Sequence, residues 1–376
     1  MRDPHAIDRP RFRLRWLIDR STDAGGLPEW FTDPRWIPPG QGRLYARAKQ
    51  GLYAALCAED ETGTVLLPAY VPGGVAWAVL AAGFDVRYYP VSSDLSLPLG
   101  AVRDRIEDVD PAAVVFVHYL GFVDEAFEEL ASAARSRNAI VIEDCARAAF
   151  SRDRAGRPLG SIGDLALFCL HKTLPVPNGG LIVSRRAHLP PPGRRQAEWK
   201  TLPDAAAVRA ARFARISLSP EPEIEHPERV TLSTVAPESP NASPGRLTER
   251  GLARCRPGDV QSTRLRRYRS LRSSLGDDPV LDVVTPAAHD MASPYGVAAL
   301  LPDAATKLRY LRALRRRGLP CEAFTWPPVH RVAEQRSFEG AEALRERLLV
   351  FPTHQRLTEA DVERIASAIA AESADR

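Results

Sequence analysis

Two short segments of the sequence place reactive side chains directly after apolar runs. Residues 139–143 (AIVIE) lead into Asp144, and residues 165–170 (LALFCL) lead into His171 and Lys172. A lysine amine condenses with an aldehyde to form a Schiff base, and an aspartate pairs with a pyridine nitrogen and keeps it protonated. Together these two groups have the chemistry that pyridoxal phosphate (PLP) requires. Each taken alone is also typical of a plainer role, namely a surface lysine or a carboxylate that caps a helix.

The patterns around these residues predict an α/β fold. Apolar residues at helical spacing predict helices over 43–58, 74–82 and 124–137, and short apolar runs predict strands over 65–68, 85–89, 112–118, 139–143, 165–170 and 180–184. Apolar strands separated by helices indicate a mostly parallel sheet covered by helices on both faces. Ligands bind beyond the carboxyl ends of such strands. The residues of most interest are therefore Tyr70, His118, Asp144 and those after Leu170.

The chain changes character after residue 189. Residues 190–244 hold ten prolines in 55 residues, which predicts a linker or a long irregular excursion. Residues 262–275 predict a basic amphipathic helix, and a surface helix with solvated arginines is favoured over nucleic-acid binding because the net charge is modest. A compact α+β lobe follows, with a helix over 304–318, a strand over 348–351 and a final helix opened by a capping box at 358–361. We predict a large PLP-binding domain over 1–189, a proline-rich insert over 190–250 and a small domain over 251–376.

The composition argues against several classes of protein. The chain has 376 residues, and 51 Lys+Arg against 47 Asp+Glu give a net charge of +4, which does not indicate nucleic-acid binding. The five cysteines stand far apart and form no CxxC pair, which disfavours a zinc site or a disulfide framework and indicates a reducing compartment. The first sixteen residues lack the apolar region of a secretory signal, and the longest near-apolar run, residues 73–84, is too short to span a bilayer. We expect a cytoplasmic protein without membrane, nucleic-acid or metal partners.

Six short motifs follow one another along the chain: residues 67–70 (LPAY), 117–121 (VHYLG), 142–146 (IEDCA), 160–164 (GSIGD), Lys172 with the glycine pair at 179–180, and 351–362 (FPTHQRLTEADV). Their order resembles that of the DegT-like family of PLP-dependent aminotransferases, which often act on nucleotide-sugars. The resemblance covers residues 42–186 well and 262–370 loosely. It implies PLP fold type I (aspartate-aminotransferase-like), PLP as the cofactor and a homodimer, because the active sites of this fold type lie at the dimer interface.

The resemblance implies a role for each matching position. Lys172 would form the Schiff base and carry the proton between Cα and C4′, and Asp144 would pair with the pyridine nitrogen. The backbone of Ala48 and Lys49, at a helix N-terminus, would meet the phosphate. Arg147 stands where family members often have Gln or His, and a guanidinium near the phenolic oxygen of the cofactor would favour its ionised form. The alternative for Arg147 is a side chain that points away into a salt bridge.

Several features depart from the family pattern. The serine that commonly precedes the lysine and binds phosphate is missing, with Cys169 at one candidate position and Leu167 at another. The residue that stacks on the cofactor ring is Tyr70 or His118, each of which also fits a core role. His171 neighbours the lysine, whereas dehydratase relatives replace that lysine by histidine, so ordinary Schiff-base chemistry is favoured. The family's hairpin that crosses to the neighbouring subunit is not found, and the proline-rich segment stands in its place.

These features favour an aminotransferase that moves an amino group from an amino-acid donor such as glutamate to a keto group of a small molecule. A nucleotide-sugar and a specialised metabolite are the candidate acceptors. Two alternatives stay open: another PLP reaction on the same scaffold, driven by Arg147, and a catalytically degenerate PLP-binding protein with a regulatory or partner role. The missing serine and hairpin motivate the second alternative, whereas the retention of both Lys172 and Asp144 argues against it.

Overall fold

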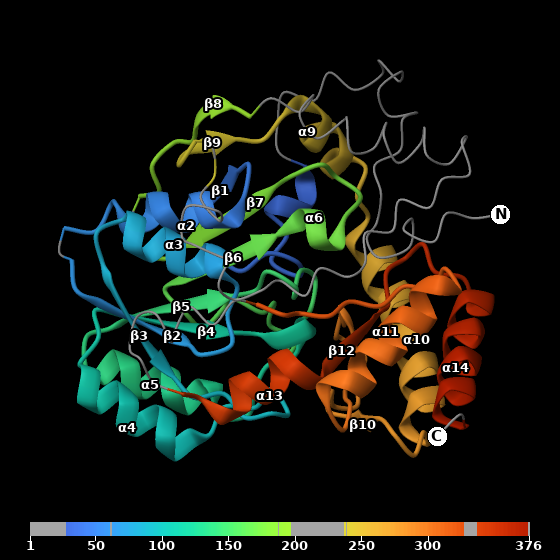
Figure 1. The fold of residues 1–376 in the computed structure, drawn as a ribbon. Helices are drawn as coiled ribbons and strands as arrows, with labels where there is room; N and C mark the ends of the chain where they lie inside the picture. Colours follow the sequence, from blue (N-terminus) through green and yellow to red (C-terminus); the bar gives the residue numbers. More distant parts are fainter. Residues whose placement is uncertain are drawn as a thin grey trace.

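The computed structural model describes residues 28–60, 62–186, 188–196, 237, 239–326 and 337–374. These residues form a large and a small lobe that lie side by side (Figure 1). Most of the predicted insert at 190–250 falls outside the described residues, so its boundaries stay predictions. In the described part of the chain, none of the helices combines the length and the apolar character needed to cross a bilayer.

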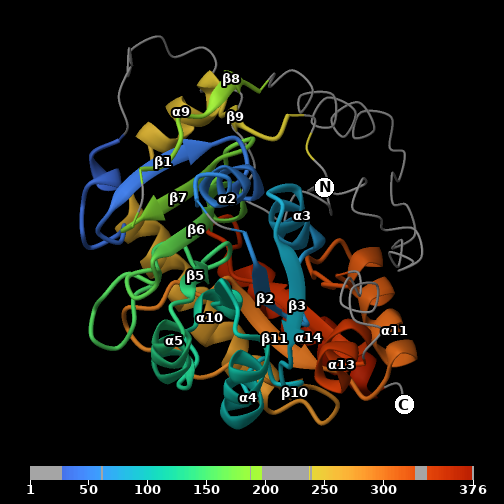
Figure 2. The same cartoon turned by 90° about the vertical axis from the view of Figure 1, so that its left-hand side faces the viewer.

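A seven-stranded sheet forms the centre of the large lobe. Its strands are β1 (Gln41–Tyr45), β2 (Thr64–Pro68), β3 (Asp85–Tyr89), β4 (Ala113–Val117), β5 (Ile140–Asp144), β6 (Leu165–Cys169) and β7 (Gly180–Ser184), in the spatial order β1-β7-β6-β5-β4-β2-β3. Strands β2 to β6 run parallel, and β7 is antiparallel to both of its neighbours. Figure 2 shows the twist of this sheet from the side. Asp144 at the end of β5 is paired with Val117 on β4 and with Leu167 on β6, so the carboxyl ends of three strands meet there.

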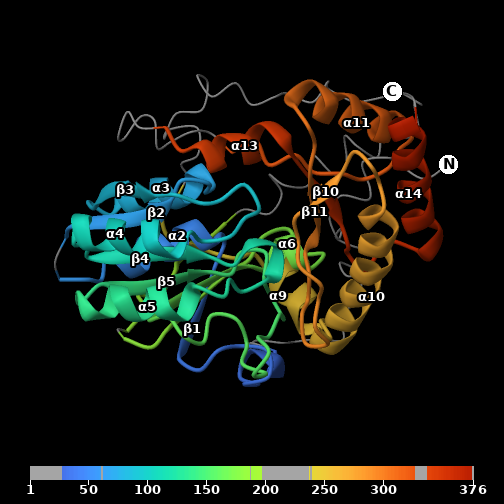
Figure 3. The same cartoon turned by 90° about the horizontal axis from the view of Figure 1, so that it is seen from below.

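Helices cover both faces of the sheet. On one face lie α2 (Ala48–Leu56) and α3 (Gly73–Ala81), and on the other lie α4 (Leu99–Val109) and α5 (Phe127–Ser136) (Figures 1 and 3). Central strands must therefore be apolar on both sides, and Val141 and Ile142 of β5 are fully buried. The predicted α/β architecture is confirmed.

The element boundaries agree with the sequence-based predictions in most places. Strands β3 and β7 have the predicted bounds, but the helix predicted over 43–58 is wrong at its start, because residues 43–45 belong to β1 and α2 begins only at Ala48. Antiparallel pairing of β1 with β7 outweighs the helical spacing of the apolar residues here. Helix α4 was missed, although Val102 and Ile106 face the core at helical spacing.

The small lobe is built on the antiparallel sheet β10 (Asp282–Val283), β11 (Gly296–Leu300) and β12 (Leu348–Pro352), together with α10 (Pro257–Gly276), α11 (Ala304–Arg316), α13 (Glu339–Arg347) and α14 (Glu359–Ala374). Helices α10, α11 and α14 pack together on its outer side (Figure 3). The predicted capping box is present before α14, because the Thr358 backbone N–H donates to Asp361 Oδ2 (2.9 Å) and the Asp361 N–H to Thr358 Oγ1 (3.2 Å). The shorter elements are η2 (Glu29–Phe31), η3 (Tyr119–Gly121), α6 (Leu170–Thr173), β8 (Gly193–Arg195), β9 (Ala242–Ser243) and α9 (Arg246–Ala253).

Candidate active site

Asp144 is a buried carboxylate at the carboxyl end of β5. Its side chain and backbone are held locally: Oδ1 accepts from the Ala146 N–H (2.8 Å), and the carbonyl accepts from the His118 N–H (3.0 Å). Burial raises the pKa of Asp144 above its ordinary value, and the positive charge of Lys172 is the strongest influence in the opposite direction. The aspartate and the lysine that the sequence singled out therefore lie close enough for their charges to interact.

Lys172 is carried by α6, a single helical turn that directly follows β6. The turn is closed by the Leu174 N–H, which donates to the Leu170 carbonyl (2.7 Å). The loop after it returns to the turn, because the Leu170 N–H donates to the Gly179 carbonyl (2.9 Å) and the Gly179 N–H to the Ala46 carbonyl (2.8 Å). Gly179 has φ +121°, which explains the need for glycine at the first position of the pair. The backbone thus fixes both ends of the segment that holds the lysine.

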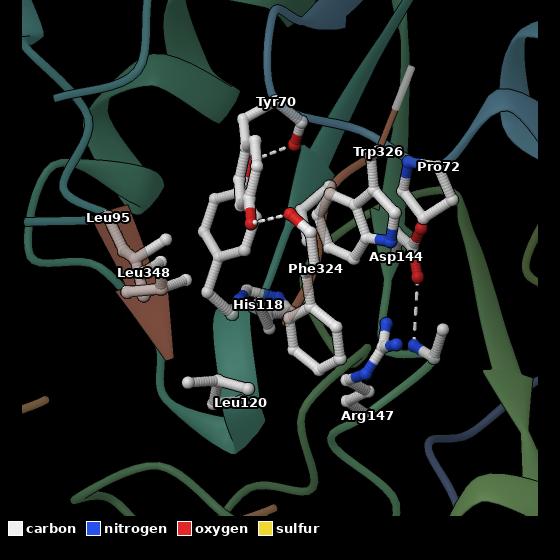
Figure 4. A pocket seen from close by; sticks show the side chains of 13 residues that line it. Tyr70, Pro72, Leu95, His118, Leu120, Asp144, Arg147, Phe324, Trp326 and Leu348 are labelled. Atoms are coloured by element: carbon white, nitrogen blue, oxygen red, sulfur yellow. Dashed lines mark hydrogen bonds between the residues drawn. The ribbon is translucent and has the colours of Figure 1, made fainter. Parts of the chain in front are cut away.

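A pocket adjoins Asp144 at this edge of the sheet (Figure 4). Its lining consists of Tyr70, Pro72, Leu95, Val117, His118, Tyr119, Leu120, Asp144, Ala146, Arg147, Phe324, Trp326 and Leu348. The cavity has a volume of about 20 Å³, roughly the space of one water molecule. Tyr70 and His118, the two predicted stacking residues, both line this pocket, whereas Ala48, Lys49, Cys169 and Lys172 do not.

Two aromatic side chains that the sequence did not single out fill this pocket. Phe324 and Trp326 come from the segment that follows α11, and their rings are stacked with centroids 5.2 Å apart and an interplanar angle of 7°. The Trp326 ring lies 4.5 Å from the ring of Tyr70, whose hydroxyl donates to the Phe324 carbonyl (2.8 Å). In Figure 4 the two rings stand between Tyr70 and Arg147. The small lobe therefore supplies one wall of the pocket.

Arg147 faces these rings. Its guanidinium carbon lies 4.0 Å from the ring centroid of Phe324 and 5.2 Å from those of Tyr295 and Trp326. Such contacts are favourable cation–π interactions. Its Nε is buried without a hydrogen-bond partner, and no carboxylate among the described residues lies within ion-pair distance of it. Arg147 thus points into the pocket, and the alternative of a side chain turned away into a salt bridge is not what the described residues show.

Glu143, immediately before Asp144, anchors the motif GSIGD beneath the strand. Its Oε2 accepts from the Gly160 N–H (2.9 Å) and contacts His118 Nε2 (2.6 Å), and its Oε1 accepts from the N–H groups of Ile162 (2.8 Å) and Gly163. Burial would raise the pKa of Glu143, but the hydrogen bond and charge of His118 and the two amides outweigh it, so the pKa lies below its ordinary value. Glu143 is not among the predicted site residues, although it stands within the first of the two motifs, IEDCA and GSIGD, that its side chain joins.

Ala48 and Lys49 open helix α2 next to β7. A Cβ on Gly180 would lie 2.0 Å from the Ala48 nitrogen, so only glycine permits this close approach. Burial lowers the pKa of Lys49, the charge of Arg47 adds to this effect, and Cys169 acts in the opposite direction. Lys49 and Cys169 therefore lie within electrostatic reach of each other, as expected if both belong to one phosphate-binding region.

The residue types fit PLP. They comprise a buried carboxylate for the pyridine nitrogen, a nearby amine for the aldehyde and a helix N-terminus for the phosphate. Phe324 and Trp326 fill the pocket on one side of Asp144, whereas Ala48, Lys49 and Lys172 lie outside the lining of that pocket. The chemistry of the donor set thus matches the cofactor.

Comparisons with known proteins find one matching family and several solved structures with a similar fold. The model of the DegT/DnrJ/EryC1/StrS aminotransferase family matches residues 47–190. The fold is similar to that of aminotransferase TlmJ from Streptoalloteichus hindustanus (22% identity, 89% of this chain and 86% of that chain, TM-score 0.64). It is also similar to Helicobacter pylori PseC, an aminotransferase involved in pseudoaminic acid biosynthesis (13% identity, 99% of this chain and 99% of that chain, TM-score 0.72). A third similar structure is DesI, solved in the presence of its TDP-sugar product (19% identity, 97% of this chain and 92% of that chain, TM-score 0.65).

The family match covers the strands and loops that carry Asp144, Arg147 and Lys172, and the fold likeness covers both lobes. Residues 47–190 therefore match the DegT/DnrJ/EryC1/StrS aminotransferase family, and the chain is a PLP-dependent transferase.

Proposed function

We propose that this protein moves an amino group from an amino-acid donor such as glutamate to a keto group of a small molecule, with Lys172 and Asp144 as its working pair. The observation that carries the proposal is the placement of the two groups. Asp144 is 2% exposed at the end of a central parallel strand, and Lys172 is the strongest favourable charge upon it. Burying a carboxylate costs free energy even when a cation lies nearby, and perturbed groups of this kind cluster at functional sites.

The roles follow from the positions of the side chains. PLP, when bound, supplies an electron-withdrawing ring that accepts the electron pair left at the substrate Cα. Asp144 holds a proton at the ring nitrogen, because a carboxylate removed from water interacts strongly with a neighbouring cation. Lys172 takes the proton from the substrate Cα and returns it. Arg147, which faces the pocket, stabilises negative charge on the phenolic oxygen, and the N–H groups of Ala48 and Lys49 bind the phosphate.

For the amino acceptor we propose a keto-sugar carried on a nucleotide. The support is the family, whose solved relatives include sugar aminotransferase CalS13 from Micromonospora echinospora and DesI with its TDP-sugar product. A panel of nucleotide-linked 4-keto sugars tests this choice, with a 2-keto acid as the comparison acceptor. Turnover of the keto acid alone would refute the sugar assignment without affecting the assignment of Lys172.

The experiment that tests the function is a visible spectrum. The purified protein is expected to take up PLP and turn yellow, and glutamate is expected to bleach the colour as the amino group is transferred to the cofactor. Lys172→Ala should abolish the yellow band. Lys307→Met is the control, because Lys307 is a lysine with little exposure (4%) that lies in the small lobe. A yellow band that survives in Lys172→Ala would refute the assignment of the lysine.

Two outcomes separate the alternative functions. A yellow protein that no amino donor bleaches would argue for a different PLP reaction, and a protein that binds PLP without forming the band would favour the degenerate binding protein. Among the described residues, the observation that favours the degenerate binding protein is that Phe324 and Trp326 fill the pocket. Retention of the interacting pair Asp144 and Lys172 supports the enzyme.

We also propose a homodimer in the cytoplasm. The dimer is implied by fold type I, whose active sites lie between subunits, and light scattering of the purified protein tests it. All five cysteines are free thiols in the structure, as expected in a reducing compartment. A monomeric protein that nevertheless turns over would refute the dimer.

A further inference from the structure

The residue directly after Lys172 is held by the small lobe. The backbone carbonyl of Thr173 accepts a hydrogen bond from Gln355 Nε2 (3.0 Å) and a longer one from Arg264 Nη2 (3.4 Å). Thr173 is the last residue of the single turn α6, and the carbonyls at the end of a helix have no partner within the helix. Two side chains from the other lobe, 91 and 182 residues away in the sequence, supply that partner.

Arg264 is an unusual residue for this task because it is a buried charge. It lies on α10, is 1% exposed, and its Nη1 donates to the Pro294 carbonyl (3.4 Å) while its guanidinium stands 5.6 Å from the ring of Tyr295. No carboxylate within the described ranges lies at ion-pair distance from it, and its Nε has no hydrogen-bond partner. Burial lowers its pKa to about 10, which still leaves it charged at neutral pH. Tyr295 and Glu322 partly offset the effect of burial on Arg264, but neither forms an ion pair with it, and a buried cation without a paired carboxylate is costly.

Gln355 approaches the same carbonyl from a different element, the segment between β12 and α14. That segment is itself fixed, since Thr353 Oγ1 donates to the Pro294 carbonyl (2.6 Å) and the Thr353 N–H to the Tyr295 carbonyl (3.2 Å). Arg264 and Gln355 are therefore attached to one rigid part of the small lobe, the start of β11 and the end of β12. On its other side the lysine segment is held within the large lobe by the Gly179 contacts described above.

We propose that Arg264 and Gln355 are positioning residues that couple the small lobe to Lys172 by fixing the carbonyl of Thr173 and hence the direction of α6. The proposal rests on the assigned role of Lys172. Without the two donors, α6 keeps its place in the chain but loses the contact that sets the orientation of the lysine relative to Asp144. Reactions that depend on alignment lose about 10²-fold in rate for a misplacement of the order of 1 Å.

The test uses the full-length holoenzyme and the variants Arg264→Gln and Gln355→Leu. We expect kcat to fall by about 10- to 100-fold while KM for the amino donor stays within about twofold, because the binding groups are unchanged. A second readout follows the bond between lysine and cofactor: the protein is stripped of PLP, PLP is added back, and the product is trapped with borohydride and assigned by mass spectrometry. Trapping at Lys172 should slow in both variants. Arg264→Lys, which keeps a charged donor, should recover part of both losses.

Arg272→Gln is the matched control. Arg272 lies on the same helix, is half-buried, and also donates to a backbone carbonyl, that of Thr285 (3.0 Å), which belongs to the segment after β10 and not to the segments that hold the lysine turn. This variant is expected to match the parent in trapping rate and in kcat. Gln355→Leu removes no charge, so it keeps the test decisive if Arg264→Gln does not fold.

The outcomes distinguish this inference from the function on which it rests. If Lys172→Ala abolishes trapping but Gln355→Leu and Arg264→Gln both trap and turn over like the parent, the positioning role is refuted and the assignment of the lysine stands. If trapping survives in Lys172→Ala, the proposed function fails and this inference fails with it. Equal slowing in Arg272→Gln would also overturn it, because the effect would then be a general loss of packing.

Discussion

Glu143→Gln is the substitution for which the structure makes the sharpest prediction of lost stability. The carboxylate is 1% exposed. Its Oε1 accepts from Ile162 and Gly163 and lies 3.8 Å from Arg185 Nη2, and its Oε2 contacts Gly160 and His118. A glutamine has one carbonyl oxygen, so its NH2 group replaces the other and faces donors. The least damaging rotamer keeps the oxygen toward Ile162 and Gly163 and turns the NH2 group toward Gly160 and His118.

The magnitude follows from what this rotamer still loses. One hydrogen bond to a charged acceptor is worth about 1.5–3 kcal/mol, and the Gly160 N–H that is left unpaired adds a penalty of about 1–3 kcal/mol. We therefore expect a loss of about 3 kcal/mol or more, which is a large part of the total stability of about 5–15 kcal/mol usual for a protein. For a cooperative unit of 150–250 residues this lowers the melting temperature by about 6–12 °C.

The assay is thermal unfolding followed by circular dichroism at two pH values. The folded pKa of Glu143 lies below its ordinary value of 4.5, so its stabilising contribution is complete above that pH and is lost as the pH falls through the folded value. The difference between Glu143→Gln and the parent should therefore be full at pH 7 and shrink in acid. Glu128→Gln is the control, since Glu128 forms an exposed pair with Arg157 that is worth under about 1 kcal/mol. A melting temperature for Glu143→Gln within 1 °C of the parent would refute the reasoning.

Three further predictions concern other parts of the molecule. Burial lowers the pKa of Lys307 to about 8 from 10.5. Keeping this lysine charged in the folded state at pH 7 therefore lowers the stability by about 3 kcal/mol, and its hydrogen bond to a carbonyl of α13 offsets about 1 kcal/mol of that loss. Lys307→Met should raise the urea midpoint at pH 7, and the gain should vanish above pH 10.5, where the lysine is neutral in both states; an unchanged midpoint at pH 7 contradicts this. Trp326→Ala should lower the Kd for PLP about tenfold in an absorbance titration, because it removes aromatic contacts of about 0.5–1.5 kcal/mol that hold the pocket closed; weaker uptake would show that the indole supports the site instead. Gly180→Ala should destabilise the protein by about 1–3 kcal/mol and weaken PLP binding, since its Cβ would lie 2.0 Å from the Ala48 nitrogen, whereas Gly100→Ala, whose Cβ meets nothing within 4 Å, should do neither.

The parallel sheet and its central pair could be predicted because their signals are local. Apolar runs bounded by turn residues define strands such as β3 and β7, and the residue after such a run must lie at the ligand edge. The start of α2 could not be placed in the same way, since β1 exists only through its pairing with β7. Local patterns over about a dozen residues do not report pairing between strands that lie far apart in the sequence.

The residues that form the wall of the pocket could not be predicted from the sequence for the same reason. Arg147 meets Phe324 and Trp326 only because the small lobe folds back over the sheet. Nothing around those aromatic residues distinguishes them from core residues in the sequence. The phosphate region was inferred from the resemblance, and its test is the behaviour of Gly180→Ala rather than any pattern in the chain.

The hydrogen bond from Tyr70 to the Phe324 carbonyl spans 254 residues, and this separation has a consequence for biosynthesis. Proteins are made from the N-terminus, and domains tend to fold as units while synthesis proceeds. All strands of the large sheet are complete at residue 184, whereas the pocket wall from the small lobe begins only beyond residue 320. On the ribosome, therefore, the Asp144 edge is exposed to solvent for the time taken to add well over a hundred residues. The wall that Phe324 and Trp326 form is therefore absent during that interval, and the Asp144 edge is covered only after the small lobe has been made.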